Sequence, residues 1–290
     1  MSTVSARTNP DLTAQVLTEA LPYIQRFRGA TVVVKFGGNA MIDPELSQTF
    51  AADVVLMHSV GIKPVVVHGG GPQIASMLNQ LGKESAFVDG LRVTDAETLD
   101  VARMVLGGKV SRDIVSAINV HGPLAVGVSG EDAGLIRATP RNADLGYVGD
   151  VADVNPAIIH RLLAEDMIPV VSSIGSDGEG QPYNINADTV AGHLAAAVGA
   201  QKLIVLTDVD GMRRDPDDPS SLIQQITAAD LHPLVGTPTV NGGMIPKVEA
   251  CLTAVDNGVA SAHMINGTLP HVLLLELFTD SGIGTMIRGN

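Results

Sequence analysis

Residues 35–40 read Lys-Phe-Gly-Gly-Asn-Ala and directly follow an apolar, β-branched run at residues 31–34. Such a run, closed by paired glycines, is typical of a buried parallel strand that enters a tight turn. Gly37 and Gly38 carry no Cβ, so backbone N–H groups there can approach an anion closely. A helix predicted over residues 44–59 would add the positive end of its dipole. Because a lysine at the end of a core strand is costly to bury without an anionic partner, the stretch indicates a phosphate site; the alternative is a lysine that reaches solvent.

The composition is that of an acidic globular protein. The chain has 290 residues, 45% of them hydrophobic, and a formal net charge of −13. This length suffices for one large α/β domain or for two lobes that share a sheet. The negative charge argues against nucleic acid and anionic membranes as partners, because both bind basic surfaces.

Cysteine and histidine usage narrows the chemistry further. The single cysteine, Cys251, excludes an internal disulfide framework and fits a reducing compartment. It lies in a helical pattern, which favours a small buried hydrophobe over a nucleophile. The eight histidines show no paired metal-ligand spacing, so no protein-built metal site is expected. No segment approaches the roughly 18 apolar residues of a membrane span, and the sequence predicts a cytoplasmic protein.

Strand-like and helix-like segments alternate along the chain. Strands are predicted at residues 31–36, 64–68, 124–129, 168–174, 203–207, 262–265 and 271–275. Helical patterns lie at residues 44–59, 72–82, 95–120, 155–166, 187–199, 227–235 and 243–258. The alternation predicts an α/β fold built from βαβ units, with helices on both faces of a mainly parallel sheet. Residues 136–152 are expected as an inserted hairpin, and a lobe boundary is expected near residues 199–200.

An amphipathic helix is predicted near the N-terminus. Apolar side chains between residues 11 and 27 fall on one helical stripe. Pro22 lies inside this pattern and is expected to kink or break the helix. Such an arm can pack on its own domain or on a neighbouring subunit, and the pattern is compatible with both.

A second glycine turn, Gly69-Gly70-Gly71, follows the strand at residues 64–68 and precedes Pro72. A strand, three glycines and a proline at the start of a helix form an anion-binding geometry. Both glycine turns belong at the carboxyl ends of parallel strands, where ligands bind. Three consecutive glycines exceed what a tight turn requires, which favours a ligand site. Neither turn matches the P-loop or the dinucleotide-binding glycine pattern.

Polar residues at later strand ends are further candidates. The guanidinium of Arg92 could hold a substrate carboxylate, although an exposed arginine is the commoner case. Asn184 and Asn186 alternate in an extended segment and therefore point the same way. Asp188 begins the next helix, where the dipole alone already favours a carboxylate.

Two segments in the last third of the chain could face a nucleotide. Residues 206–211 follow a core strand and could hold a ribose and base, or form an ordinary Asp-Gly turn. In residues 241–247 a glycine pair opens a helix. Lys247 on its first turn could stand beside a phosphate, or be solvated surface.

In this order, the stretches resemble the amino acid kinase family. The match runs from about residue 30 to the C-terminus, and the ordered set of motifs is far more specific than any one of them. The wider family, including carbamate and aspartate kinases, shares the Lys-x-Gly-Gly turn. Asp-Gly-Leu-Arg-Val-Thr at residues 89–94 and Asn-x-Asn-Ala-Asp at residues 184–188 resemble the branch that phosphorylates N-acetyl-L-glutamate in arginine biosynthesis.

The resemblance implies a three-layer sandwich around a mainly parallel sheet, with two lobes that share it. Residues 1–29 would form an oligomerisation arm. Residues 30–199 would form the N-acetylglutamate-binding lobe, and residues 200–290 the ATP-binding lobe with a C-terminal effector loop.

Roles for individual residues also follow from the resemblance. Lys35 and Lys247 would flank the transferring phosphoryl group, and Asp188 would hold both lysines. The residues implied to bind substrate are Gly70, Gly71, Arg92, Asn184 and Asn186, with Arg92 on the α-carboxylate. The residues implied to line the ATP site are Gly37, Gly38, Thr207, Asp208, Asp210, Gly211, Gly242, Gly243 and Met244. The attacking γ-carboxylate is already anionic and needs no general base, and Mg²⁺ would bind through the ATP phosphates.

Regulation by L-arginine is implied by the same resemblance. Arginine-inhibited members carry a kinked N-terminal helix that joins dimers into a hexamer, a trimer of dimers, and residues 11–28 are similar to it. Residues 276–285 resemble their effector loop. The residues implied to bind L-arginine are Tyr23, His263, Glu276 and Gly282, with Glu276 on the guanidinium; an exposed carboxylate at a strand end is the alternative for Glu276.

Other functions remain open on the sequence. A different acylphosphate-forming kinase would use glutamate, aspartate or carbamate. A non-catalytic amino acid sensor would keep the fold and the arginine pocket, although the presence of both lysines and Asp188 favours an active enzyme. An NAD-dependent oxidoreductase lacks support because its glycine fingerprint is missing.

Overall fold

The computed structural model describes residues 9–88, 90–215, 217–279 and 282–289. A loose terminus is predicted at residues 1–10, of which residues 1–8 lie outside the described residues, while Asn9 and Pro10 already begin a helix. Asp89, in the segment that contains Arg92, and residues 280–281 in the predicted effector loop also lie outside the described residues.

The β-branched run before the first glycine turn forms a central strand. β1 (Thr31–Phe36) pairs in parallel with β2 (Lys63–His68) on one side and with β11 (Lys202–Thr207) on the other. The remaining strands of the central sheet are β5 (Ala125–Ser129), β8 (Ile168–Ser172), β12 (Gln225–Thr227), β13 (Ser261–Asn266) and β14 (Gly284–Arg288). Their order is β12-β14-β13-β11-β1-β2-β8-β5, and among the described residues β13–β14 is its one antiparallel pair. The predicted parallel α/β sheet is confirmed.

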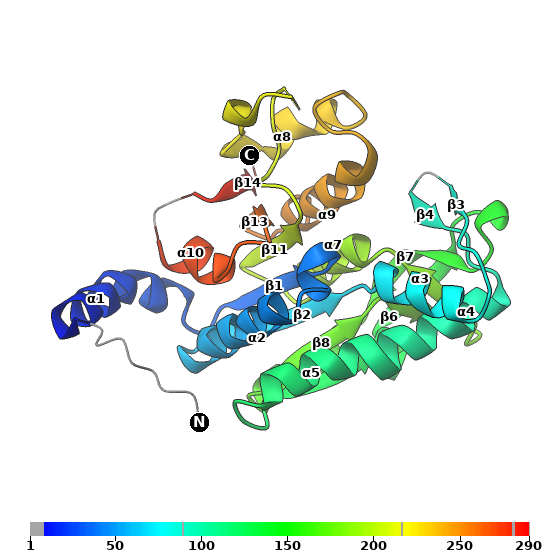
Figure 1. Ribbon diagram of the computed structural model, residues 1–290, viewed down its shortest axis with the longest axis horizontal. Helices are drawn as coiled ribbons and strands as arrows, with labels where there is room; N and C mark the ends of the chain where they lie inside the picture. The colour runs from blue at the N-terminus through cyan, green and yellow to red at the C-terminus, as the bar shows by residue number, and fades with distance from the viewer. Residues whose placement is uncertain (1–8, 89, 216, 280–281, 290) are drawn as a thin grey trace.

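Helices cover both faces of this sheet (Figure 1). On one face pack α2 (Pro44–Ser59), α3 (Gly71–Gln80), α4 (Ala96–Arg103), α5 (Ser111–Asn119) and α10 (Val272–Phe278). On the other face pack α6 (Ala157–Ala164), α7 (Ala187–Ala197), α8 (Ala228–Leu231) and α9 (Ile245–Asp256). Strand alternation divides the core between the faces. Val32 and Val34 join the first cluster and Val33 the second, so Lys35 belongs to the face that α7 covers.

The predicted hairpin exists but does not join the central sheet. β6 (Ile136–Pro140) and β7 (Val148–Val154) pair antiparallel, and with β9 (Ile174–Ser176) and β10 (Pro182–Ile185) they close a small barrel. An additional two-stranded ribbon, β3 (Phe87–Val88) with β4 (Leu91–Arg92), was not predicted. This ribbon carries Arg92.

Two of the predicted elements differ in the structure. The strand predicted at residues 271–275 is wrong: the segment lies in α10, because a short leucine-rich run cannot be assigned by periodicity alone. The helix predicted at residues 95–120 is continuous, but a π-helical segment, η2 (Met104–Val110), separates α4 from α5.

The N-terminal arm is a helix, α1 (Pro10–Phe27), at the end of the molecule opposite the β3–β4 ribbon (Figure 1). It runs through Pro22 without a break, and a kink at Pro22, the other expected outcome, stays a prediction. No helix in the described part of the chain combines the length and apolar character needed to cross a membrane.

Candidate active site

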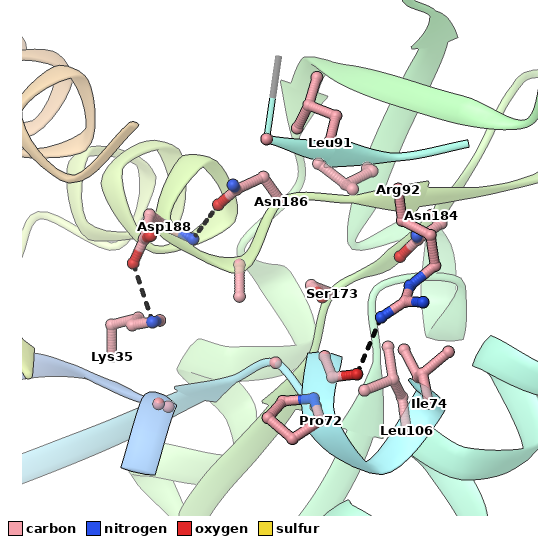
Figure 2. A pocket seen from close by; sticks show the side chains of 18 of the residues that line it. Lys35, Pro72, Ile74, Leu91, Arg92, Leu106, Ser173, Asn184, Asn186 and Asp188 are labelled. Carbon is pink, nitrogen blue, oxygen red and sulfur yellow. Dashed lines mark hydrogen bonds and ion pairs between the residues drawn. The ribbon is translucent and has the colours of Figure 1, made fainter. Parts of the chain in front are cut away.

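One carboxylate joins two lysines from opposite ends of the sequence. The Asn186 side chain caps α7 by accepting the N–H of Asp188 at 2.7 Å, which fixes Asp188 in the first turn of the helix. The Lys35 Nζ at the end of β1 lies 3.0 Å from Asp188 Oδ1 (Figure 2). The Lys247 Nζ, from the first turn of α9, lies 3.3 Å from Asp188 Oδ2. The structure therefore brings together the three residues predicted to be catalytic.

Burial and charge act in opposite directions on this triad. Asp188 is 4% exposed and Lys35 7%. Burial alone would raise the pKa of Asp188, but the positive charges of Lys35 and Lys247 outweigh it, and the net pKa is lowered. The carboxylate stays ionised and compensates one of the two positive charges, so the site retains a net positive charge for an anion.

A cavity of about 230 Å³ opens beside the triad, at the carboxyl ends of β1 and β2. It extends from Lys35 and Asp188 at one end to Arg92 and Asn184 at the other (Figure 2). Other lining residues are Gly37, Gly38, Gly70, Gly71, Ile74, Leu106, Val148, Ser173 and Asn186. The position agrees with the rule that ligands bind outside the carboxyl ends of parallel strands.

Arg92 is a buried group rather than an exposed one. It is 8% exposed, and burial lowers the pKa of its guanidinium. Its Nη2 donates to the Gly71 carbonyl at 2.9 Å, and its Nη1 donates to the Ser85 hydroxyl. The guanidinium carbon lies 4.7 Å from the centre of the Phe87 ring. These contacts fix a positive charge at the far end of the cavity, as an anion clamp requires.

The glycine turns pack too closely against neighbouring side chains to carry side chains of their own. A Cβ on Gly37 would lie 2.7 Å from the Lys35 Nζ, and one on Gly38, where φ is +72°, would lie 2.8 Å from the Asp208 carboxylate. A Cβ on Gly70 would lie 2.7 Å from Leu106. These glycines therefore leave room for a ligand and for the charged groups around it. The two glycine turns, with Lys35 and Lys247 beside them, fit the phosphates of a nucleotide.

The two asparagines differ in what their side chains contact. Both line the cavity. The Asn184 Nδ2 donates to the Thr94 hydroxyl at 3.3 Å, whereas the Asn186 side-chain oxygen caps α7. Asn184 thus belongs to the Arg92 end of the cavity, and Asn186 also fixes the start of the helix that carries Asp188.

Comparison with known proteins identifies the family. The model of the amino acid kinase family matches residues 30–266. An acetylglutamate kinase from Synechococcus sp. strain RCC307 is 54% identical over 292 residues, covering 100% of this chain and 99% of its own. One from Saccharopolyspora erythraea is 56% identical over 281 residues, covering 94% and 92%. The chain belongs to the acetylglutamate kinases of the amino acid kinase family.

Solved structures share the fold of this chain. The N-acetylglutamate synthase of Neisseria gonorrhoeae, solved with coenzyme A and N-acetyl-glutamate, is similar with a TM-score of 0.83 and 27% identity. The match covers 96% of this chain but only 63% of the synthase. The same synthase in complex with coenzyme A and L-arginine gives a TM-score of 0.79 at 25% identity, covering 95% of this chain and 65% of that one. As an acetylglutamate kinase, the chain is an enzyme of arginine biosynthesis.

The residues predicted to line the ATP site lie on the other side of β1. Thr207 is buried at the end of β11, next to β1 in the sheet. Asp210 accepts from the Asn266 side chain at 2.9 Å, and a Cβ on Gly211 would lie 2.6 Å from the Thr285 hydroxyl. The tight turn formed by Gly242, Gly243 and Met244 precedes α9, and the Gly243 carbonyl accepts from the Lys247 Nζ at 3.4 Å. Apart from Gly37 and Gly38, none of these predicted residues lines the 230 Å³ cavity.

A second cavity, of about 220 Å³, lies where α1, β13 and α10 meet. Tyr23, His263 and Glu276 line it, whereas Gly282 is exposed and is not among its lining residues. Glu276 is not an exposed carboxylate at a strand end: its side chain is 7% exposed and it lies inside α10. The Lys202 Nζ lies 2.9 Å and the His263 Nδ1 2.6 Å from Glu276 Oε1.

Burial and electrostatic interactions together set the protonation of this second cluster. Burial lowers the pKa of His263 and of Lys202, in each case against the opposing effect of Glu276, which raises both pKa values. Burial alone would raise the pKa of Glu276, but the hydrogen bond from His263 and the charge of Lys202 outweigh it, and the net pKa is lowered. Glu276 is therefore an ionised carboxylate that forms part of the wall of this cavity.

Several residues that line the two cavities or hold their side chains were not predicted from the sequence. Ser173, which lines the first cavity, and Ser85, which accepts from Arg92, carry no local signal, because single serines occur in any loop. Leu106 reads as an ordinary core residue. Lys202 could have been predicted from the sequence, because it begins a core strand just as Lys35 lies at the end of one. A buried lysine requires an anionic partner.

The remaining reactive side chains do not contribute to the site. Cys251 is fully buried in α9, and burial raises the pKa of its thiol, so it is no nucleophile. Among the described residues, no group of three or more His, Cys, Asp or Glu side chains could hold a metal ion.

Proposed function

We propose that this enzyme transfers the γ-phosphoryl group of MgATP to the γ-carboxylate of N-acetyl-L-glutamate and is inhibited by L-arginine. The observation that carries the proposal is the bridge from Asp188 to Lys35 and Lys247, at one end of a cavity that has the buried Arg92 at its other end. A dicarboxylate substrate fits between these two positive ends. One end holds the α-carboxylate and the other activates transfer to the γ-carboxylate.

In this proposal Arg92 binds the α-carboxylate. Its position is fixed by its bonds to Gly71 and Ser85, so little reorganisation accompanies binding. Asn184 binds the acylated amino group beside it, and Asn186 holds the segment in place through its cap of α7. Backbone N–H groups of the two glycine turns donate to the substrate and to phosphate oxygens.

The reaction needs only charge and alignment. A γ-carboxylate oxygen forms a bond to the γ-phosphorus of ATP while the bond from that phosphorus to the β,γ-bridging oxygen breaks, and ADP leaves with the electron pair. No proton is transferred, which agrees with a site built from lysines, a carboxylate and glycines. Lys35 and Lys247 neutralise the charge on the phosphoryl oxygens, and Asp188 keeps both ammonium groups aligned. Mg²⁺, bound through the nucleotide phosphates, supplies further charge neutralisation when present.

We assign the nucleotide to the side of β1 that faces β11. Thr207 ends β11, which lies next to β1, and Asp208, Asp210 and Gly211 follow it. The turn at residues 242–244 leads into the helix that carries Lys247. Residues 30–199 then form the lobe for the acylated amino acid and residues 200–290 the nucleotide lobe. The two lobes share the central sheet through the parallel pair β1–β11.

The second cavity is our candidate for the L-arginine site. The ionised Glu276 is suited to a guanidinium, and Tyr23 from α1 closes the cavity beside it. A related fold, the Neisseria gonorrhoeae synthase, has been solved with L-arginine, which supports the same ligand here. Gly282 lies in the segment after α10, and we keep it as a contact of the bound ligand.

The arm α1 supports assembly into a hexamer. Its apolar side chains are exposed, with Leu12 at 54%, Val16 at 54%, Leu17 at 64% and Leu21 at 48%. An apolar stripe of this kind is typical of a surface that packs on another chain. We propose that α1 joins dimers into a trimer of dimers. Sedimentation of a chain without residues 1–28 tests this, since we expect an active dimer; a truncated hexamer would contradict the role of the arm.

The experiment that tests the activity is ATP-dependent acylphosphate formation, trapped with hydroxylamine. It compares N-acetyl-L-glutamate with L-glutamate, each with and without L-arginine. We expect turnover of the acetylated substrate only, suppressed by L-arginine. Turnover without suppression would keep the kinase and remove the effector site, and no turnover with L-arginine still bound would favour an amino acid sensor.

A further inference from the structure

The long helix that lies against the substrate cavity has an irregular segment. η2 (Met104–Val110) is π-helical and interrupts the helix between α4 and α5. It contains Gly107 and Gly108, and a Cβ on either would meet no atom within 4 Å. Close packing therefore does not require these glycines. Their effect is to weaken the α-helix, which eases the wider π turn at this point.

The π turn directs two side chains onto the second glycine turn. A Cβ on Gly70 would lie 2.7 Å from Leu106 Cδ2 and 3.1 Å from Val110 Cγ2. Leu106 also lines the substrate cavity and is 1% exposed. In Figure 2 Leu106 lies beside Ile74, near the guanidinium of Arg92. The π turn thus supplies an apolar wall at the Arg92 end of the cavity.

The chemistry of an N-acylated dicarboxylate requires such a wall. The molecule has two carboxylates and one uncharged acyl group. In the proposed function, the Lys35 end of the cavity takes one carboxylate and Arg92 takes the other. The acyl group branches from the same carbon as the α-carboxylate, so it lies at the Arg92 end. A methyl group binds to apolar surface rather than to charge, and Leu106 and Ile74 are apolar side chains that line the cavity near Arg92.

We propose that Leu106, held against the cavity by the π turn, sets the largest acyl group that the enzyme accepts. This inference rests on the proposed function and names a specificity-determining residue for it. In a packed apolar pocket, one additional methylene changes kcat/KM by about 10–200-fold. Truncating Leu106 to alanine removes three carbon atoms from the wall, and this space can hold the added carbons of a propionyl or butyryl group.

The test measures kcat/KM of the full chain for N-acetyl-, N-propionyl- and N-butyryl-L-glutamate, by ADP release. For the wild type we expect N-acetyl to be preferred over N-propionyl by about 10–200-fold. In Leu106→Ala this preference falls at least about tenfold. Calorimetric binding of the same three ligands without nucleotide is expected to change in parallel. Leu106→Val, a smaller truncation, carries the test if the alanine variant does not fold.

Leu78→Ala is the matched control. Leu78 is as buried as Leu106, belongs to the same core cluster and is not among the residues that line the cavity. It should lower thermal stability without changing the acyl preference. An unchanged preference in folded Leu106 variants overturns this inference while the kinase activity stands. Failure of the wild type to phosphorylate N-acetyl-L-glutamate overturns the proposed function and this inference together.

Discussion

Replacing Asp188 with asparagine tests the core of the proposed mechanism. Asp188→Asn keeps the size of the side chain but removes the charge that lies 3.0 Å from the Lys35 Nζ and 3.3 Å from the Lys247 Nζ. At an effective dielectric constant of about 20, each pair at these distances has a gross attraction of about 5 kcal/mol. The net loss is smaller, because the lysines regain solvation when they move apart. Removing one partner of a buried ion pair usually costs about 3–5 kcal/mol.

The expected effect on catalysis is larger than the effect on binding. Without Asp188 the two ammonium groups repel each other and no longer converge on the phosphoryl group. Loss of one preorganised charge-stabilising contact usually lowers kcat about 10²–10³-fold. We therefore expect kcat to fall by about this factor while KM for the acetylated substrate, which is held at the Arg92 end, changes less. Hydroxylamine-trapped acylphosphate gives the rate, and thermal unfolding shows whether the variant is folded.

Asp53→Asn is the control for a change in a buried carboxylate. Asp53 on α2 is 2% exposed and pairs with His271 at 2.7 Å, and it is not among the lining residues of the substrate cavity. This variant should change stability and leave kcat within about twofold. A folded Asp188→Asn variant that retained kcat within about threefold of the wild type would refute the assignment of Asp188 as the residue that aligns the lysines.

Three further predictions address protonation, the effector and packing. Burial lowers the pKa of His68 to about 4, against 6.5 in the unfolded chain. The folded state therefore loses on the order of 3 kcal/mol of stability as the pH falls from above 6.5 to below 4. Urea unfolding at pH 7 and pH 5 should show a weaker pH dependence of stability in His68→Gln than in the wild type, and an equal dependence would contradict the role of His68. Glu276→Gln should raise the L-arginine concentration needed for half-inhibition at least about tenfold, because the negative charge proposed to face the guanidinium is lost. The rate without L-arginine should not change. Equal inhibition of the variant and the wild type would show that Glu276 is not part of the effector site. Gly70→Ala should destabilise the fold by about 1–3 kcal/mol, because the added Cβ would contact Leu106. Gly71→Ala should lower the free energy of unfolding less, because open space surrounds the position of its Cβ. Equal unfolding midpoints of the two variants would contradict the packing argument.

Local pattern predicted the part of the site that lies on regular elements. The β-branched runs and the glycine turns fixed β1, β2 and the direction of their carboxyl ends, and alternation along β1 determines which face Lys35 occupies. Pattern alone did not pair Lys35 with a carboxylate, because that carboxylate is supplied by α7, far along the chain. The family resemblance named Asp188, and the packing of α7 on the same face as Val33 explains the contact.

Short or irregular elements escaped prediction for a physical reason. β9 and β10 have three and four residues, too few for a period-2 pattern to be recognised, so the small barrel read as a lone hairpin. In the π turn of η2 the backbone hydrogen bonds join residues five apart instead of four, which shifts the faces of the helix that follows. The spacing of apolar residues in the sequence does not reveal such a shift. The position of Leu106 against the cavity therefore becomes visible only in the folded structure.

The wrong assignment of α10 changed the meaning of Glu276. If residues 271–275 formed a strand, Glu276 would follow its end and lie in solvent. In a helix, a residue shares a face with those three and four positions before it, here the buried Leu273 and Val272. Glu276 therefore points inward, and a carboxylate in that position is stable only when a cation or hydrogen-bond donors face it. The ammonium group of Lys202 and the imidazole of His263 are those partners, so the helical period itself places an otherwise ordinary acidic residue at the second cavity.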